Sequence, residues 1–331
     1  MTDTAQPAGP AAQTGPSPGA RVLRALWAPR DIASLAVFRI LFGGLMMVSA
    51  LRFLLSDWIP QLYGEPTFFF KHWGLAWIPV PPQWALVAIY IALTVLAGLV
   101  ALGLLYRLSI VLFTALFTYT QLLDVTNYLN HYYLVVLLGL LMCFMPLHRG
   151  WSLDAWRKPA LASATLPAWC LYLLRFQVAV VYCFAGLAKL NSDWLLHAQP
   201  LGIWLSARTE FPLIGVYFDE LWLAYTMSWA GFLFDSSIVV WLSLRRTRPW
   251  AYAVVIGFHL LTSLLFNIGM FPYIMIVAAT LLFDPSWPRR LVRPTRHVTE
   301  QDSASGAASP DLEYRDQTRA QPARPHLGPG R

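Results

Sequence analysis

The segment FAGLAKLNSDW, residues 184–194, places a lysine at the end of a long apolar run. Lysine is costly at the edge of a hydrocarbon layer, so Lys189 is a candidate functional residue. Apolar surroundings disfavour the charged ammonium, and a lysine in such surroundings can act as a general base. A simpler interpretation is that Lys189 extends to the membrane interface beside Trp194.

A second polar group lies in LNHYYL, residues 129–134, where Asn130 and His131 open another apolar segment. A histidine with an asparagine beside it can donate hydrogen bonds to a developing anion. Asn130 could instead cap a helix, and His131 could be a hydrogen-bonded histidine at the interface. With Lys189, these residues favour proton transfer in an apolar pocket on a lipid-soluble substrate.

The common motifs of other chemistries are missing from the sequence. It has no metal-ligand spacing, no HExxH, no phosphate-binding glycine loop and no GxSxG, so no metal site is predicted. The basic residues are scattered over separate loops, which argues against a nucleic-acid partner.

The composition is that of a membrane protein. Of the 331 residues, 57% are hydrophobic and only 12% are charged, whereas soluble domains carry about 25% charged residues. Aromatic residues make up 15% of the chain and gather at bilayer interfaces in such proteins. We therefore expect an all-α, polytopic bundle of transmembrane helices.

A membrane span needs about 20 largely apolar residues, and about eight segments approach that pattern. They are roughly 33–55, 83–105, 108–124, 130–147, 169–189, 218–243, 250–267 and 269–284. Two aromatic loops, after the first span and over about 190–217, are expected at the interface. The Ala- and Pro-rich segment 1–29 and the polar segment 293–331 are expected to be disordered tails.

Charge predicts the orientation of these eight spans. Most of the 24 lysines and arginines lie in the two terminal segments and in every second loop. The positive-inside rule then places both termini in the cytoplasm. Lys189 and His131 fall together at the opposite, non-cytoplasmic end. Three further ionisable residues, Arg39, Arg175 and His259, lie within predicted spans and are functional candidates for that reason.

Ordered segments of the chain resemble the membrane domain of vitamin K-dependent γ-glutamyl carboxylases and the wider horizontally transferred transmembrane (HTTM) domain family. They are AVFRILFGGLM, ALGLLYRLSIVLF, LLDVTNYLNHYYL, RGWSLDAW, VVYCFAGLAKLNSDW, FHLLTSLLFNIGMFPYIM and DPSWPRRL. The resemblance covers about residues 30–292, which we take as one carboxylase-like transmembrane domain.

The resemblance implies a reaction. In the family, a lysine deprotonates reduced vitamin K, a quinol, and oxygen then generates a strong base and a quinone epoxide. That base removes a proton from a protein glutamate, whose carbanion captures carbon dioxide. Lys189 matches the lysine, His131 matches the histidine proposed to stabilise the carbanion, and Asn130 precedes it as in the family. A menaquinol-like quinol, O2 and CO2 are the implied co-substrates.

Departures from the family limit what is implied. The carboxylases continue into a large extramembrane region that helps to hold the protein substrate, and here only about 40 polar residues follow DPSWPRRL. The partners expected are membrane lipid, a quinone and a secreted peptide or protein. A non-catalytic quinone- or lipid-binding protein of the same fold is the alternative. The Arg-rich, Ala- and Pro-rich composition suggests a bacterial inner or plasma membrane.

Overall fold

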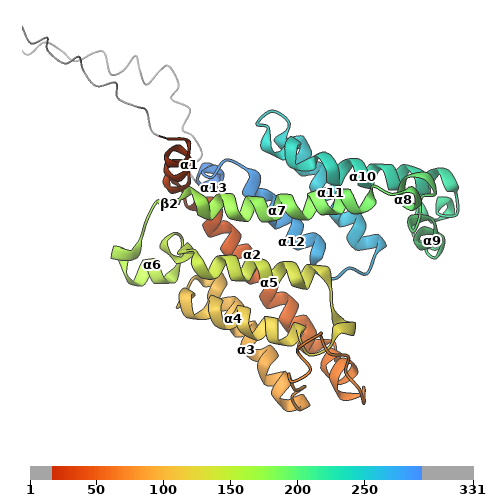
Figure 1. Ribbon diagram of the computed structural model, residues 1–331, viewed down its shortest axis with the longest axis horizontal. Helices are drawn as coiled ribbons and strands as arrows, with labels where there is room; N and C mark the ends of the chain where they lie inside the picture. Colours follow the sequence, from red (N-terminus) through yellow and green to blue (C-terminus); the bar gives the residue numbers. More distant parts are fainter. Residues whose placement is uncertain (1–16, 293–331) are drawn as a thin grey trace, which may run out of the picture. The chain divides into compact units, whose positions relative to one another are not determined.

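The computed structural model describes residues 17–292, and this part of the chain is mainly helical (Figure 1). Its only strands are β1 (Pro29–Asp31) and β2 (Thr165–Pro167), three residues each, which pair antiparallel. The predicted all-α class is confirmed for these residues. The predicted C-terminal tail, 293–331, and residues 1–16 of the predicted N-terminal tail lie outside the described part.

Eight helices correspond to the eight predicted segments. They are α2 (Ala33–Leu55), α3 (Gln83–Leu102), α4 (Tyr106–Gln121), α5 (Asn130–Phe144), α7 (Ala168–Lys189), α10 (Leu221–Ser243), α11 (Arg248–Leu265) and α12 (Phe271–Ala279). Short helices are α1 (Pro18–Trp27), α6 (Leu153–Arg157), α8 (Ser192–Leu196), α9 (Leu201–Ser206) and α13 (Trp287–Val292). Single turns are η1 (Pro60–Gly64), η2 (Val125–Asn127), η3 (Leu147–Arg149), η4 (Pro159–Leu161), η5 (Gly215–Tyr217) and η6 (Thr280–Leu282).

The structure does not support the predicted count of eight membrane spans. Within residues 17–292, four helices are long and apolar enough to cross a membrane: α2, α3, α7 and α10. Helices α4 and α5 have 16 and 15 residues, which at about 1.5 Å per residue fall short of a hydrocarbon core of about 30 Å. The orientation deduced from eight alternating spans therefore stays a prediction.

The predicted N-terminal tail is helical where it is described. Helix α1 begins at Pro18, because the Ser17 side chain accepts a hydrogen bond from the Ala20 backbone N–H (3.3 Å) and proline suits the first helical position. The following Ala28 carbonyl accepts from the Ala168 backbone N–H (2.9 Å) at the start of α7. The segment is thereby tied to the bundle.

Helix α2 lies in the hydrophobic core and packs closely on α3. Phe38, Phe42 and Met46 are at most 2% exposed, and the ring of Phe53 stacks on that of Tyr90 in α3 with centroids 4.1 Å apart. Gly43 permits the contact, since a Cβ there would lie 2.5 Å from the Ala101 backbone N. Small residues let membrane helices approach in this way.

Two neighbouring glycines test this packing. Gly43→Ala is expected to lower the free energy of unfolding by about 1–3 kcal/mol, because backbone must move to admit the methyl group. Gly44→Ala should raise it by up to about 1 kcal/mol, since a Cβ at Gly44 meets nothing within 4 Å and alanine is the better helix former. Thermal unfolding in detergent measures both. Equal effects at the two positions would contradict a close contact at Gly43.

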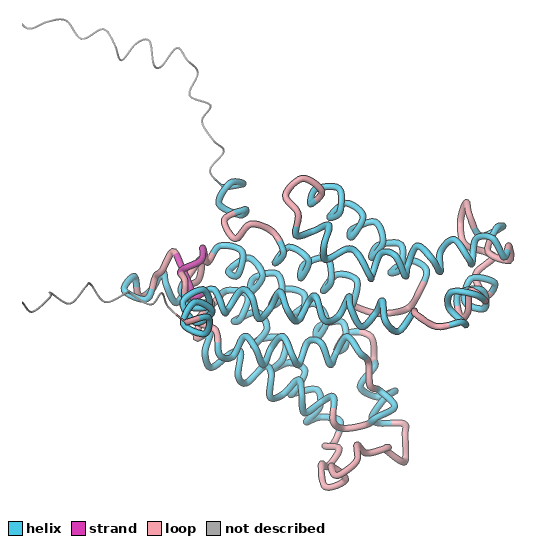
Figure 2. The backbone as a smooth tube through the Cα atoms, turned by 45° about the horizontal axis from the view of Figure 1, so that its top comes forward, coloured by secondary structure: helices cyan, strands magenta, loops and turns pink. Residues whose placement is uncertain are grey.

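The long helices run side by side, and the connecting loops gather at their ends (Figure 2). Helix α7 starts beside β2 and ends at Lys189, so its two ends are separated by about 33 Å. Helices α1, α6 and α13 lie near its start, and α8 and α9 near its end (Figure 1). The second predicted aromatic loop, 190–217, contains α8 and α9 and is held by a small core in which Leu205, Phe218 and Leu265 are buried.

Candidate functional site

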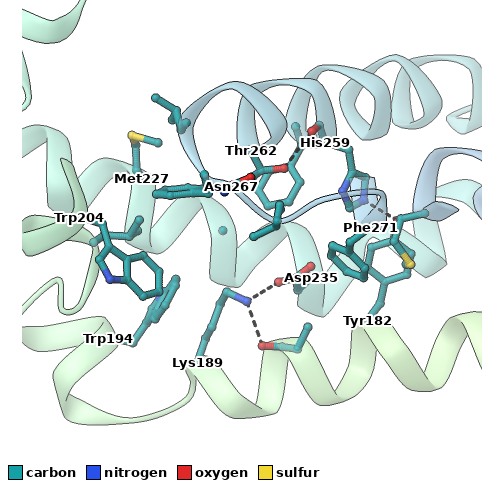
Figure 3. Close-up of a pocket in the computed structure, with 18 of the residues that line it drawn as sticks. Tyr182, Lys189, Trp194, Trp204, Met227, Asp235, His259, Thr262, Asn267 and Phe271 are labelled. Carbon is teal, nitrogen blue, oxygen red and sulfur yellow. Dashed lines mark hydrogen bonds and ion pairs between the residues drawn. The ribbon is translucent and has the colours of Figure 1, made fainter. Parts of the chain in front are cut away.

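A cavity of about 650 Å³ lies beside the end of α7, bounded by α7, α10, α11, α12 and the segment of α8 and α9. Its lining is mainly apolar and aromatic, with Trp194, Trp204, Phe258, Phe266 and Phe271 among its side chains. Figure 3 views this cavity, with Lys189 and Asp235 directed toward each other in its lining. Its size and its few polar groups are typical of a site for a small apolar ligand.

An ion pair joins α7 to α10 inside the cavity. The Nζ atom of Lys189 donates to Oδ2 of Asp235 at 2.6 Å and to the carbonyl of Ala185 at 3.2 Å. The two side chains are only 18% and 7% exposed. Lys189 is also the last residue of α7, where the helix dipole favours a positive charge.

The sequence NSDW, residues 191–194, positions an aromatic wall over this lysine. The Asn191 side chain accepts a hydrogen bond from the Trp194 backbone N–H (2.9 Å) and so caps α8. The indole N–H of Trp194 donates to the Ser228 carbonyl on α10 (2.8 Å). The ring is thereby fixed with its centroid 5.0 Å from Nζ of Lys189, within the range of a cation–π contact.

A glycine lets α7 and α10 come together beside the ion pair. A Cβ at Gly186 would lie 2.8 Å from the Ser236 hydroxyl and 3.3 Å from the Ser236 backbone. On α10, a Cβ at Gly231 would make only an ordinary contact with Cε of Lys189, at 3.8 Å. The close approach of the two helices therefore explains the glycine that stands three positions before Lys189.

A second polar pair lines the cavity away from Lys189. The Tyr182 hydroxyl and Nε2 of His259 are 3.1 Å apart and both side chains are buried. The Nδ1 atom of His259 is buried without a hydrogen-bond partner among the described residues. Thr262 and Asn267 add polar groups to the same wall (Figure 3). The cavity thus has hydrogen-bonding groups at two separate places in an apolar lining.

Of the predicted site residues, Lys189 lines the cavity, whereas His131 and Asn130 do not. His131 is buried at the start of α5, and its ring lies 6.2 Å from that of Phe271, whose ring lies 6.0 Å from that of His259. Asn130 is exposed and does not cap α5, because Leu129 occupies the cap position. The catalytic roles of His131 and Asn130 stay predictions.

Asp235 is the site residue that the sequence analysis missed. It lies in FLFDSSIVV, where a single carboxylate interrupts an apolar helix. The rule that selected Arg39 and His259, an ionisable group inside a span, selects Asp235 equally well. What the sequence could not supply is its partner, since Lys189 lies 46 residues away.

Two of the predicted candidates instead cap helix ends. Arg39 is fully buried and donates to the carbonyls of Val100 and Ala101 (both 3.0 Å) at the end of α3, and to that of Trp151 (2.6 Å). Arg175 donates to the carbonyls of Leu281 (2.7 Å) and Phe283 (2.5 Å) around η6. Both arginines donate to backbone carbonyls at the end of a helix or in the loop beside it.

Comparison with known proteins places this architecture in a family. No solved structure matches the chain. The HTTM domain matches residues 27–287, which include the elements from β1 to α12 and every residue of the cavity. This match agrees with the resemblance read from the sequence, and carboxylase activity is a further step that it does not include. The chain belongs to the HTTM domain family.

Proposed function

We propose that this protein is an integral membrane enzyme that binds a reduced quinone of the vitamin K type in the cavity and removes a proton from it with Lys189 and Asp235. The observation that carries the proposal is the ion pair of 2.6 Å within a mainly apolar cavity of about 650 Å³. Its alternative is a membrane protein of the same fold that holds a quinone or lipid without reaction.

The residues present fit a quinol. The flat ring system and isoprenoid tail of such a molecule need an apolar slot, and Trp194, Trp204 and Phe266 supply aromatic walls. Its two hydroxyl groups need polar partners on opposite edges. The ion pair provides one, and the Tyr182–His259 pair with Thr262 and Asn267 provides polar groups elsewhere in the lining.

Lys189 and Asp235 would have different roles in removing a proton from the ligand. In the pair Lys189 is the hydrogen-bond donor and Asp235 the acceptor, so the carboxylate of Asp235 would be the group that accepts the proton of the ligand. The ammonium of Lys189, 2.6 Å from that carboxylate, would then hold the anion left on the ligand by a charge-assisted hydrogen bond. A bound quinol supplies the acidic hydroxyl and the reducing equivalents that react with dioxygen.

The remainder of the proposed activity follows the family resemblance. O2 and CO2 would be co-substrates, and the γ-carbon of a glutamate in a secreted peptide or protein would be carboxylated. His131 would stabilise the developing carbanion, with Asn130 beside it. Supporting this, the His131 ring is buried next to Phe271, which lines the cavity, and Nε2 of His131 has no partner among the described residues.

We further propose a bacterial inner or plasma membrane with cytoplasmic termini and the cavity toward the non-cytoplasmic side. Basic residues support this orientation. Arg30, Arg289 and Arg248 lie near the start of α7, the first two around β1 and the third against Phe283. Lys189 lies at the other end of the same helix. A basic end facing the cytoplasm satisfies the positive-inside rule.

One observation favours the non-catalytic alternative. The Lys189 Nζ atom donates hydrogen bonds to Asp235 and Ala185, an arrangement that suits a lysine that only donates hydrogen bonds to a ligand head group. Both functions require that the protein binds a quinone, and only the enzyme converts it. They are therefore separated by measuring quinone content and quinone reaction on the same purified protein.

Purified protein in nanodiscs is expected to retain quinone detectable by mass spectrometry and to convert reduced vitamin K in the presence of O2 and CO2. Lys189→Gln should lower that turnover by about 10²–10⁴-fold, the usual contribution of a positioned acid–base group. Arg246→Gln, which also removes one positive charge but from an exposed loop residue, should leave it unchanged. Retained quinone without turnover in the unmodified protein would establish the binding function instead, and no quinone at all would refute both.

A further inference from the structure

A second, basic cavity lies far from Lys189, at the end of the bundle where α7 begins. It measures about 300 Å³ and is formed by the start of α4, the η3 turn and the α6 segment. Arg107, Arg157 and Lys158 line it together with the apolar side chains of Leu108 and Leu161. Three positively charged side chains around one small cavity favour the binding of an anionic ligand.

The one acidic residue of this cavity is already engaged. The carboxylate oxygens of Asp154 accept hydrogen bonds from the backbone N–H groups of Leu105 (2.9 Å) and Tyr106 (3.0 Å), which open α4. Within residues 17–292, Arg157 and Lys158 have no ion pair. The cavity therefore keeps a surplus of positive charge.

The positive charge of the cavity affects the pKa of its histidine, His148. His148 lies in η3, outside the long helices, and its ring stacks near Tyr106 with centroids 5.5 Å apart. Burial lowers the pKa of His148, and the positive charge of Arg107 lowers it further. An anion bound beside Arg107 would act in the opposite direction and raise this pKa.

An apolar groove lies next to the basic cavity, along α4 and α5. It has a volume of about 690 Å³ and is lined by Val111, Ala115, Leu140 and Phe144, among others. The two are adjacent, because Arg107, which lines the cavity, donates to the carbonyl of Cys143 (2.9 Å), which lines the groove. The groove has the shape and polarity for an acyl chain that starts at the basic cavity.

Exposed tryptophans mark the level of the basic cavity in the membrane. Trp151 and Trp156, in the segment that contains α6, are 40% and 78% exposed. Tryptophan is enriched at the height of lipid head groups. A cationic cavity at that height, beside an apolar groove, matches a phospholipid rather than a soluble anion.

We propose that the basic cavity and the adjoining groove together form a binding site for one anionic phospholipid. Arg107, Arg157 and Lys158 hold its phosphate and head group, and the surface between α4 and α5 holds an acyl chain. This site is separate from the Lys189 cavity, and the inference does not depend on the proposed function.

Native mass spectrometry of the purified protein with added phosphatidylglycerol or phosphatidylcholine tests the site. The unmodified chain is expected to bind the first lipid in preference. The double variant Arg157→Gln and Lys158→Gln should weaken phosphatidylglycerol binding by about 30-fold, since each basic residue near an anionic lipid contributes about fivefold. Arg245→Gln with Arg246→Gln removes the same charge from exposed residues outside the cavity and should change binding less than threefold.

The variant Ala115→Trp separates a lipid from a free phosphate. Ala115 is exposed in the groove and outside the basic cavity, so the indole should block the acyl chain and weaken phosphatidylglycerol binding while the protein stays folded. Inorganic phosphate up to millimolar concentration should not displace the lipid. Equal losses in the two double variants, unchanged binding in Ala115→Trp, or displacement by inorganic phosphate would each overturn the proposal.

Discussion

Asp235→Asn is expected to lower the turnover of reduced vitamin K by about 10²–10⁴-fold while quinone binding changes by less than about tenfold. Asparagine keeps the size of the side chain and its hydrogen bond to Lys189. It cannot take up a proton, and it removes the negative charge 2.6 Å from Nζ of Lys189. Steady-state conversion of the quinol and its binding affinity, measured on the same preparation, give the two quantities.

Asp219→Asn is the matched control for this prediction. It makes the same chemical change at an exposed carboxylate outside the cavity, and its turnover should equal that of the unmodified protein. The double variant Lys189→Gln and Asp235→Asn should be little worse than either single variant, because groups that act as a unit are not additive. Full activity in Asp235→Asn would exclude the carboxylate as the proton acceptor and leave Lys189 to act alone.

The sequence predicts the helices of this protein well because apolar runs are their main signal. Each of the eight predicted segments corresponds to a helix, and the breaks between them follow from local chemistry. Gly103, with φ of +64°, ends α3, and Gly269, with φ of +60°, precedes α12. The number of spans was not predictable in the same way. Apolar composition does not distinguish a helix that crosses a membrane from a shorter one inside the bundle.

The candidate site could be predicted only in part from the sequence. Lys189 was predicted from its cost in an apolar segment, and the structure places it in the cavity. Its pairing with Asp235, on another helix, depends on how α7 and α10 pack. The position of His131 behind Phe271 likewise depends on tertiary structure. The rule that an ionisable residue within a span is functional also selected Arg39, which caps a helix end. The rule therefore does not distinguish structural from functional residues.

Arg39→Met is expected to lower the free energy of unfolding by about 3 kcal/mol. Methionine fills much of the same space but donates no hydrogen bond. The part-buried carbonyls of Ala101 and Trp151 would then each lose a hydrogen bond from a charged donor, worth about 1.5–3 kcal/mol. The Val100 carbonyl adds no such cost, because it still accepts a hydrogen bond from the backbone N–H of Gly103 (3.1 Å). Unfolding followed by tryptophan fluorescence in detergent measures the change.

Arg52→Met makes the same replacement on the same helix and is the control. Arg52 is exposed, and its side chain lies against the sulfur of Met270 (3.3 Å) and the ring of Trp58 (5.4 Å) without donating to a backbone carbonyl of the described residues, so its loss should cost less than about 1 kcal/mol. Arg39→Lys then separates charge from geometry. Lysine keeps the charge without the planar fork that reaches both the end of α3 and Trp151. It should therefore be nearly as unstable as Arg39→Met, and a stability equal to that of the unmodified protein would mean that positive charge alone holds α3 to the segment around Trp151.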